Sequence, residues 1–86
     1  MNKKITVRNE FGKIRYCVLD GNRDFEQQLN EWQFGSAHPN GGICVCFRPT
    51  EIQFVDYFHA DPMATFPILS IEDTDEDVAL KWIDVK

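Results

Sequence analysis

The chain has 86 residues, of which 43% are apolar, and a net charge of −5. This length allows one domain, residues 1–86, with a modest hydrophobic core, and seven Phe, two Tyr and two Trp exclude a disordered tail. No apolar run approaches the ~20 residues that cross a bilayer, and no signal-peptide pattern follows the basic start. Three cysteines cannot all pair within one molecule, so we expect reduced thiols and a cytoplasmic protein.

Charge is distributed unevenly along the sequence. Residues 1–48 hold seven basic and five acidic side chains, whereas residues 49–86 hold two basic and nine acidic ones. Five carboxylates, which we call the acidic cluster, lie within six positions: Glu72, Asp73, Asp75, Glu76 and Asp77. Such polarity is typical of a protein that contacts another macromolecule. The alternative is a solvated face that only promotes solubility.

Two alternating segments near the N-terminus predict a β-hairpin. Residues 4–8 and 13–18 alternate apolar and polar side chains on either side of a turn at residues 9–12. The alternation predicts an apolar face formed by Ile5, Val7, Ile14, Tyr16 and Val18. The other face is then basic and holds Lys4, Thr6, Arg8, Lys13 and Arg15. Such a face can bind phosphate or carboxylate, or it can protect a sheet edge against aggregation.

A helix is predicted from the capping residue Asn22 to about Gln33, after a turn at residues 20–22. Its apolar stripe has helical spacing and is expected to pack on the sheet: Phe25, Leu29 and Trp32. The opposite face is expected to meet water and holds Gln27, Gln28, Asn30 and Glu31. The stripe therefore predicts that this helix lies over the sheet.

Three further segments have β character. Residues 43–48 are apolar up to Phe47 and partly β-branched, the pattern of a central strand buried on both faces. Residues 50–59 fit either a helix, through a capping-box pattern, or a strand, and their Ile, Phe, Val and Tyr content favours the strand. Residues 65–71 predict an edge strand, because Pro67 has no N–H to donate to a neighbour.

The last predicted element is a short C-terminal helix. Thr74 is expected to cap it, and the carboxylates of residues 75–77 suit the positive end of a helix dipole. The whole pattern predicts the α+β class: a small single domain with a mostly antiparallel sheet. The N-terminal hairpin and two or three further strands would form this sheet, packed by one central helix.

Cysteine and histidine supply the candidate metal chemistry, at an unfavourable spacing. Cys44 and Cys46 are one residue apart on a predicted strand, whereas zinc sites favour a gap of about two to four residues on a turn. Two small buried side chains are the simpler interpretation. His38 and His59 complete the set of candidate ligands. The spacing therefore predicts no metal. Because no nucleophile elbow or phosphate loop surrounds these residues, we also predict no cofactor and no catalytic residue.

The leading hypothesis is a non-enzymatic inhibitor or antitoxin-like protein, typical of viral or mobile-element counter-defence. Its acidic cluster would replace phosphates in the basic site of a nucleic-acid-binding or nucleic-acid-cleaving partner, with Trp82 as a desolvated anchor. The alternative is an RNA-associated adaptor that uses the basic hairpin face, Lys4, Arg8, Lys13 and Arg15. A small zinc-dependent or thiol-dependent enzyme is the third hypothesis. No membrane contact is expected, and a domain of this size would gain stability as a homodimer.

Overall fold

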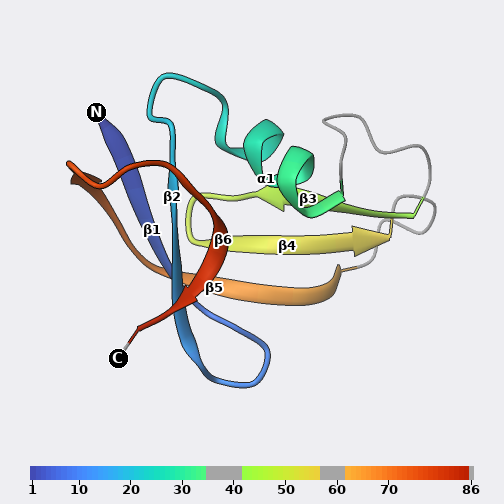
Figure 1. Ribbon diagram of the computed structural model, residues 1–86. Coiled ribbons are helices and arrows are strands. Elements are labelled where there is room, and N and C mark those ends of the chain that lie inside the picture. The colour runs from blue at the N-terminus through green and yellow to red at the C-terminus, as the bar shows by residue number, and fades with distance from the viewer. Residues whose placement is uncertain (35–41, 57–61, 86) are drawn as a thin grey trace.

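The computed structural model describes residues 1–34, 42–56 and 62–85. The elements are β1 (Asn2–Arg8), β2 (Ile14–Leu19), α1 (Phe25–Phe34), β3 (Ile43–Phe47), β4 (Glu51–Asp56), β5 (Pro62–Thr74) and β6 (Ala79–Asp84). Neighbouring strands are antiparallel, in the order β3-β4-β5-β1-β2-β6. The sheet curls into a half-barrel with α1 beside β3 (Figure 1). Within the described residues, no helix has the length and apolarity that a membrane crossing requires.

The long strand β5 joins the two halves of the sheet. Its first part, up to Pro67, pairs with β4, and its second part, from Ile68, pairs with β1. The missing N–H of Pro67 falls at this changeover, and the N–H of Ile68 donates to Thr50 O at 2.9 Å. The prediction of an edge strand was therefore wrong. Strand β5 is central because its proline lies where one partner strand replaces the other.

The N-terminal hairpin is confirmed, but its predicted faces were wrong. The register pairs Ile5 with Cys17 and Val7 with Arg15, so Arg15 lies on the inner face. The turn is one residue longer than predicted, because Asn9 Oδ1 accepts hydrogen bonds from the N–H groups of Phe11 and Lys13, both at 2.9 Å. One extra turn residue shifts the register and moves the side chains of a strand to the opposite face.

Helix α1 forms close to its predicted position and contributes to the core. Its capping residue is Asp24 and not Asn22, because Asp24 Oδ1 accepts the N–H of Gln27 at 2.8 Å. Leu29 is fully buried in a cluster that includes Ile5 and Ile52, and the rest of the apolar stripe packs against this cluster. The predicted apolar stripe is thus confirmed.

The predicted solvent face of α1 was wrong at Gln28 and Asn30, which are only 2% and 5% exposed. The Gln28 amide bonds both backbone groups of Asp20, at 2.8 and 2.9 Å. Asn30 Nδ2 donates to Val45 O at 3.1 Å, and Asn30 Oδ1 accepts the N–H of Val45 at 2.8 Å. These side-chain amides can be buried because their polar atoms form hydrogen bonds with backbone groups.

Strand β3 is an edge strand whose free side is occupied by α1. Besides the two bonds between Asn30 and Val45, Glu26 Oε1 accepts the N–H of Phe47 at 2.8 Å. The prediction of a central strand was wrong, because helix side chains satisfy the backbone groups that another strand would otherwise bond. The prediction that residues 50–59 form a strand is confirmed by β4 up to Asp56, and residues 57–59 lie outside the described residues.

The predicted C-terminal helix was wrong, because residues 79–84 form strand β6, which pairs with β2. Thr74 Oγ1 accepts the N–H of Glu76 at 3.1 Å, and the chain then turns toward β6. A threonine hydroxyl that accepts a nearby backbone N–H can cap a helix or close a turn, so Thr74 did not distinguish a helix from a turn.

The predicted central helix was also wrong. The antiparallel sheet dominates the fold, and α1 bridges its two edge strands, β3 and β6. On the β6 side, Trp82 Nε1 donates to Gln33 Oε1 at 3.3 Å. The helix therefore spans the opening of the half-barrel, because its side chains bond to both edges of the sheet.

Candidate functional site

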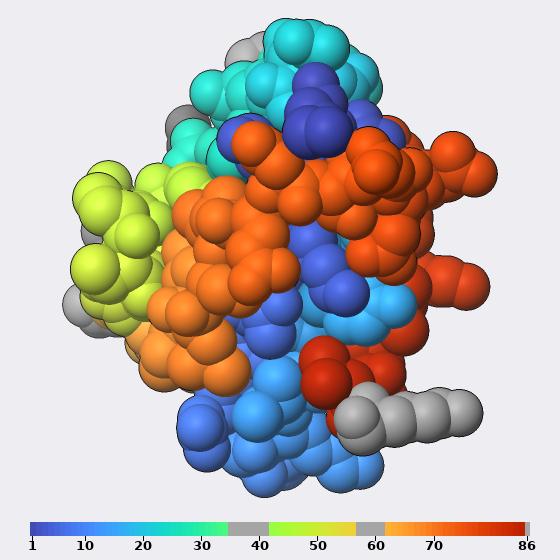
Figure 2. Space-filling model, turned by 90° about the vertical axis from the view of Figure 1, so that its left-hand side faces the viewer, coloured from blue at the N-terminus to red at the C-terminus, as the bar shows by residue number. Residues whose placement is uncertain are grey.

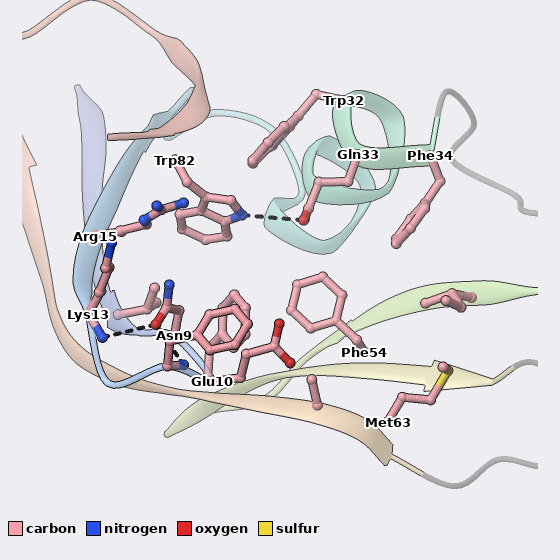
Figure 3. Close-up of a pocket in the computed structure, with 15 residues that line it drawn as sticks. Asn9, Glu10, Lys13, Arg15, Trp32, Gln33, Phe34, Phe54, Met63 and Trp82 are labelled. Carbon is pink, nitrogen blue, oxygen red and sulfur yellow. Dashed lines mark hydrogen bonds between the residues drawn. The ribbon is translucent and has the colours of Figure 1, made fainter. Parts of the chain in front are cut away.

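A pocket opens between the hairpin turn, the C-terminal end of α1 and the inner faces of β4, β5 and β6 (Figure 3). Its volume is about 870 Å³, within the size range of small-molecule sites. Six aromatic side chains line it: Phe11, Trp32, Phe34, Phe54, Phe66 and Trp82. We call it the aromatic pocket.

Five of these rings form a continuous chain of contacts. Trp32 meets Trp82 with ring centroids 5.5 Å apart, and Trp82 meets Phe66 at 6.0 Å. Phe66 then meets Phe54 at 4.8 Å, and Phe54 meets Phe34 at 6.5 Å. The chain of rings begins and ends on α1 and passes through β6, β5 and β4. Aromatic contacts of this kind stabilise one another's orientation, so the walls of the pocket are held in place.

Strand alternation explains why these rings point inward. Phe54 is two residues after Ile52 on β4, and Ile52 is fully buried in the core, so both side chains lie on the inner face. On β5, Phe66 pairs with Ile52, and Ala64 pairs with Phe54. Ala64 also lines the pocket. A small side chain opposite a large one contributes to the space of the cavity.

The polar groups of the pocket come from the hairpin and from α1. Lys13 is exposed and makes no ion pair within the described residues. Arg15 Nε lies 2.7 Å from Asp84 Oδ1 and is buried, without a hydrogen bond of normal geometry. Trp32 Nε1 is also buried, and it has no hydrogen-bond partner in the described part of the chain. The pocket therefore combines apolar walls with the cations Lys13 and Arg15 and the carboxylate of Glu10.

No family model, curated protein or solved structure matches this chain significantly. The side chains of the aromatic pocket therefore provide the evidence for its chemistry. Aromatic walls accept a flat apolar group, and Lys13 and Arg15 attract negative charge.

The acidic cluster gathers at the opposite end of the β1–β2 hairpin, beside the N-terminus (Figure 2). Asp73 forms an ion pair and a hydrogen bond with Lys3, and Glu76 Oε2 lies 3.3 Å from Lys4 Nζ. Asn2 Nδ2 also donates to Glu76 O at 2.9 Å. The N-terminal basic residues thus act as counter-ions of the acidic cluster. Charges that are segregated in the sequence meet in the fold.

The structure separates the other predicted site residues. Trp82, predicted to anchor a partner beside the acidic cluster, lies in the aromatic pocket instead. Lys4 lies on the outer face of the sheet, with its Nζ 4.3 Å from the centre of the Tyr16 ring. Arg8 is exposed at the end of β1, whereas Lys13 and Arg15 line the pocket. The four basic residues therefore do not share one face.

The ion pair between Lys3 and Asp73 predicts a measurable shift in acid titration. The hydrogen bond and charge of Lys3 hold the pKa of Asp73 below its ordinary value. This carboxylate therefore stabilises the fold above its ordinary pKa, and the contribution is lost as pH falls through the lowered pKa. We expect Lys3→Met to raise the pKa of Asp73, measured by NMR titration of side-chain carboxyl carbons. Lys81→Met is the control, and an unchanged pKa in Lys3→Met would contradict the pairing.

The cysteines give no metal site within the described residues, where no three potential ligands lie together. Cys44 and Cys46 are both partly buried on β3. Cys17, on β2, is fully buried in the core. His38 and His59, the other two candidate ligands, lie outside the described residues.

We expect the three thiols to differ in reactivity. Burial raises the pKa of Cys17 to about 12, so its reactive thiolate is scarce at neutral pH and the sulfur is sterically shielded. In the folded protein at pH 8, Ellman's reagent is expected to modify Cys44 and Cys46, and Cys17 only after unfolding in urea. In Cys17→Ala, the folded protein should release the same amount of chromophore as the folded wild type. Equal rates for all three thiols in the folded wild type would contradict this expectation.

Proposed function

We propose that this protein is a small non-enzymatic binding protein, and that the aromatic pocket binds a flat apolar group carrying negative charge. The continuous chain of five rings is the observation that carries this proposal. At the mouth of the pocket, Phe11 and Met63 are 80% and 60% exposed. Large apolar side chains that are exposed to solvent around a cavity are typical of a binding surface.

Lys13 and Arg15 supply positive charge for an anionic ligand, against the carboxylates of Glu10 in the lining and of Asp84 beside Arg15. Lys13 has no carboxylate partner within the described residues, and Arg15 retains N–H donors beyond the Nε that faces Asp84. The described lining residues include no hydroxyl, thiol or imidazole, and the amine of Lys13 and the carboxylate of Glu10 are the nucleophilic groups present. The reduced thiols favour a cytoplasmic location.

A fluorescent aromatic anion tests this proposal directly. We expect 1-anilinonaphthalene-8-sulfonate to bind the folded protein saturably with 1:1 stoichiometry. Both tryptophans of the chain line the pocket, so energy transfer from indole to dye should report binding. Phe11→Ala and Lys13→Ala change exposed side chains and should each weaken binding at least fivefold.

Matched controls for this titration are Leu69→Ala and Arg48→Ala, which change exposed residues that do not line the pocket. These controls should bind the dye as the wild type does. Dye binding that fails to saturate, or that is equal in Phe11→Ala, Lys13→Ala and the controls, would exclude the pocket as the binding site.

A second candidate function uses the acidic cluster to occupy the basic site of a nucleic-acid-binding or nucleic-acid-cleaving partner. Among the described residues, Asp73 pairs with Lys3 and Glu76 with Lys4, and the other three carboxylates of the cluster form no ion pair. The bonds of Glu76 to Asn2 and Thr74 pre-organise the turn. A surface held in one conformation loses less entropy on binding.

Capture of partners from a lysate, with nuclease treatment, tests this second function. Glu72, Asp75 and Asp77 make no ion pair within the described residues, so neutralising them leaves the contacts of the turn intact. We expect the Glu72→Gln, Asp75→Asn, Asp77→Asn triple variant to lose a protein that the wild type retains. The charge-conserving control Glu72→Asp, Asp75→Glu, Asp77→Glu should keep it. Equal recovery with both variants would rule out the acidic cluster.

A further inference from the structure

We propose that the ligand of the aromatic pocket is a nucleotide unit, with the base among the rings and the phosphate at Lys13 and Arg15. This inference rests on the proposed function of the pocket. A nucleotide combines the features that the site complements: a flat heteroaromatic ring, hydrogen-bond acceptors on its edge, and an adjacent negative charge. The shared chemistry has two sources, a free nucleotide and a single-stranded nucleic acid.

The aromatic side chains provide the surface on which a base stacks. Phe11 projects from the hairpin turn, and Phe34, which is 38% exposed, lies at the end of α1, so exposed rings border the pocket on two elements. Trp32 and Trp82, whose rings contact each other, also line the pocket (Figure 3). Stacking on aromatic side chains tolerates any base, because each base has a π face.

The polar groups match the edge of a base. Trp32 Nε1 is a buried donor without a partner in the described chain, so a base carbonyl or ring nitrogen would accept from it only after neighbouring side chains shift. Gln33 Oε1 already accepts from Trp82 Nε1, which holds this amide at the pocket wall (Figure 3). The carboxylate of Glu10, which also lines the pocket, can accept from an amino or sugar hydroxyl group.

The two cations lie next to this stacking surface. The N–H of Lys13 is bonded to Asn9 Oδ1 at 2.9 Å, which fixes the hairpin turn that carries the lysine. The side chain of Arg15 extends beside Trp82 in Figure 3. Lysine and arginine are the side chains that bind phosphate oxygens with charge-assisted hydrogen bonds. The phosphate is therefore expected at the hairpin side of the pocket, next to the stacked base.

The distant acidic cluster does not oppose phosphate binding at this site, where the nearby carboxylates are Glu10 and the Asp84 that pairs with Arg15. Lys3, at the acidic end of β1, is six residues from Asn9, which is about 20 Å at ~3.3 Å per residue of strand. The Debye length is about 8 Å at physiological ionic strength, so the acidic cluster is screened at the pocket. The cluster also has its own counter-ions, Lys3 and Lys4.

The experiment uses three probes: uridine monophosphate, uridine without phosphate, and a short single-stranded oligouridylate. Each is titrated against the full chain by calorimetry and by NMR of the two indole N–H groups. We expect saturable 1:1 binding of the monophosphate and a shift of the Trp32 indole signal. Phe11→Ala should lower the affinities for uridine monophosphate and for uridine at least fivefold. Lys13→Ala should lower the affinity for the monophosphate and leave the affinity for uridine unchanged. Arg48→Ala, which lies outside the pocket, should change neither affinity.

Salt dependence provides a second measurement. Two phosphate contacts predict a slope of log affinity against log salt of about −1.4 for the oligouridylate, and Lys13→Ala should reduce its magnitude by about 0.7. Affinity much higher for the oligomer than for the monophosphate would support a single strand as the source. Equal affinities would support the free nucleotide.

Failure of the nucleotide inference is distinguishable from failure of the pocket itself. If the dye binds at the pocket but neither the monophosphate nor the oligomer displaces it, the nucleotide inference is wrong and the binding function stands. Displacement by a fatty acid or an aromatic peptide alone would also overturn the nucleotide inference, and it would name another occupant. If neither the dye nor any of the three probes binds, both proposals fail.

Discussion

Replacing Asn30 by leucine is expected to lower the free energy of unfolding by about 3 kcal/mol. Leucine has a similar size but no polar group, so the N–H and C=O of Val45 would lose both hydrogen bonds that the amide makes. A buried backbone group left without a partner costs about 1–3 kcal/mol. Asn30 is almost completely buried, so water cannot readily replace the lost bonds.

Urea and thermal unfolding measure this effect. For a domain of this size, a loss of about 3 kcal/mol lowers the melting temperature by roughly 12–24 °C. Gln27→Leu is the matched control, because Gln27 is exposed on the same helix and should change stability by less than about 0.5 kcal/mol. A loss below about 1 kcal/mol for Asn30→Leu would mean that the amide does not hold α1 to β3.

The second large effect is expected for Leu29→Ala. Leu29 is fully buried between α1 and the sheet, in the cluster that includes Val45 and Ile52. Truncation of a buried leucine costs about 2–5 kcal/mol, because it removes apolar contacts and leaves a cavity. We also expect weaker dye binding in the aromatic pocket, because α1 contributes Trp32 and Phe34 to its wall.

Leu29→Met separates these consequences. Methionine conserves most of the volume and should cost less than about 1.5 kcal/mol, with dye affinity close to that of the wild type. Unfolding in urea gives the stability, and the fluorescence titration gives the affinity of the same variants. A stability loss below about 1 kcal/mol for Leu29→Ala would contradict the position of this side chain in the core.

Sequence patterns predicted strands well where alternation was local, as in the hairpin of β1 and β2. They failed where one residue or one partner changed the outcome. The extra turn residue stabilised by Asn9 moved Arg15 to the inner face. Thr74 carries a bond that serves a helix cap and a turn equally, and the free edge of β2 then selected a strand. Local strand propensity does not indicate which edge of a sheet is unpaired and can accept another strand.

The candidate site was harder to predict than the fold. The acidic cluster and the basic residues were recognised, but their mutual pairing depends on the register of β1 against β5. The rings of the aromatic pocket come from the hairpin turn, α1, β4, β5 and β6. These rings are not regularly spaced in the sequence, so no pattern indicated that they meet. The composition showed only that the chain has many aromatic residues. The amides of Gln28 and Asn30 resembled surface residues, because their backbone partners are distant in sequence.

The bridge that α1 makes between β3 and β6 covers a sheet edge, and it would link occupancy of the proposed ligand site to resistance against self-association. If α1 moved away, the backbone groups of Val45 and Phe47 would become an open template for another chain. The same movement would dismantle the aromatic pocket, since Trp32 belongs to α1 and Trp82 to β6. A ligand that binds only the closed arrangement therefore disfavours the open one by mass action. Fibril formation and ligand concentration should be inversely related.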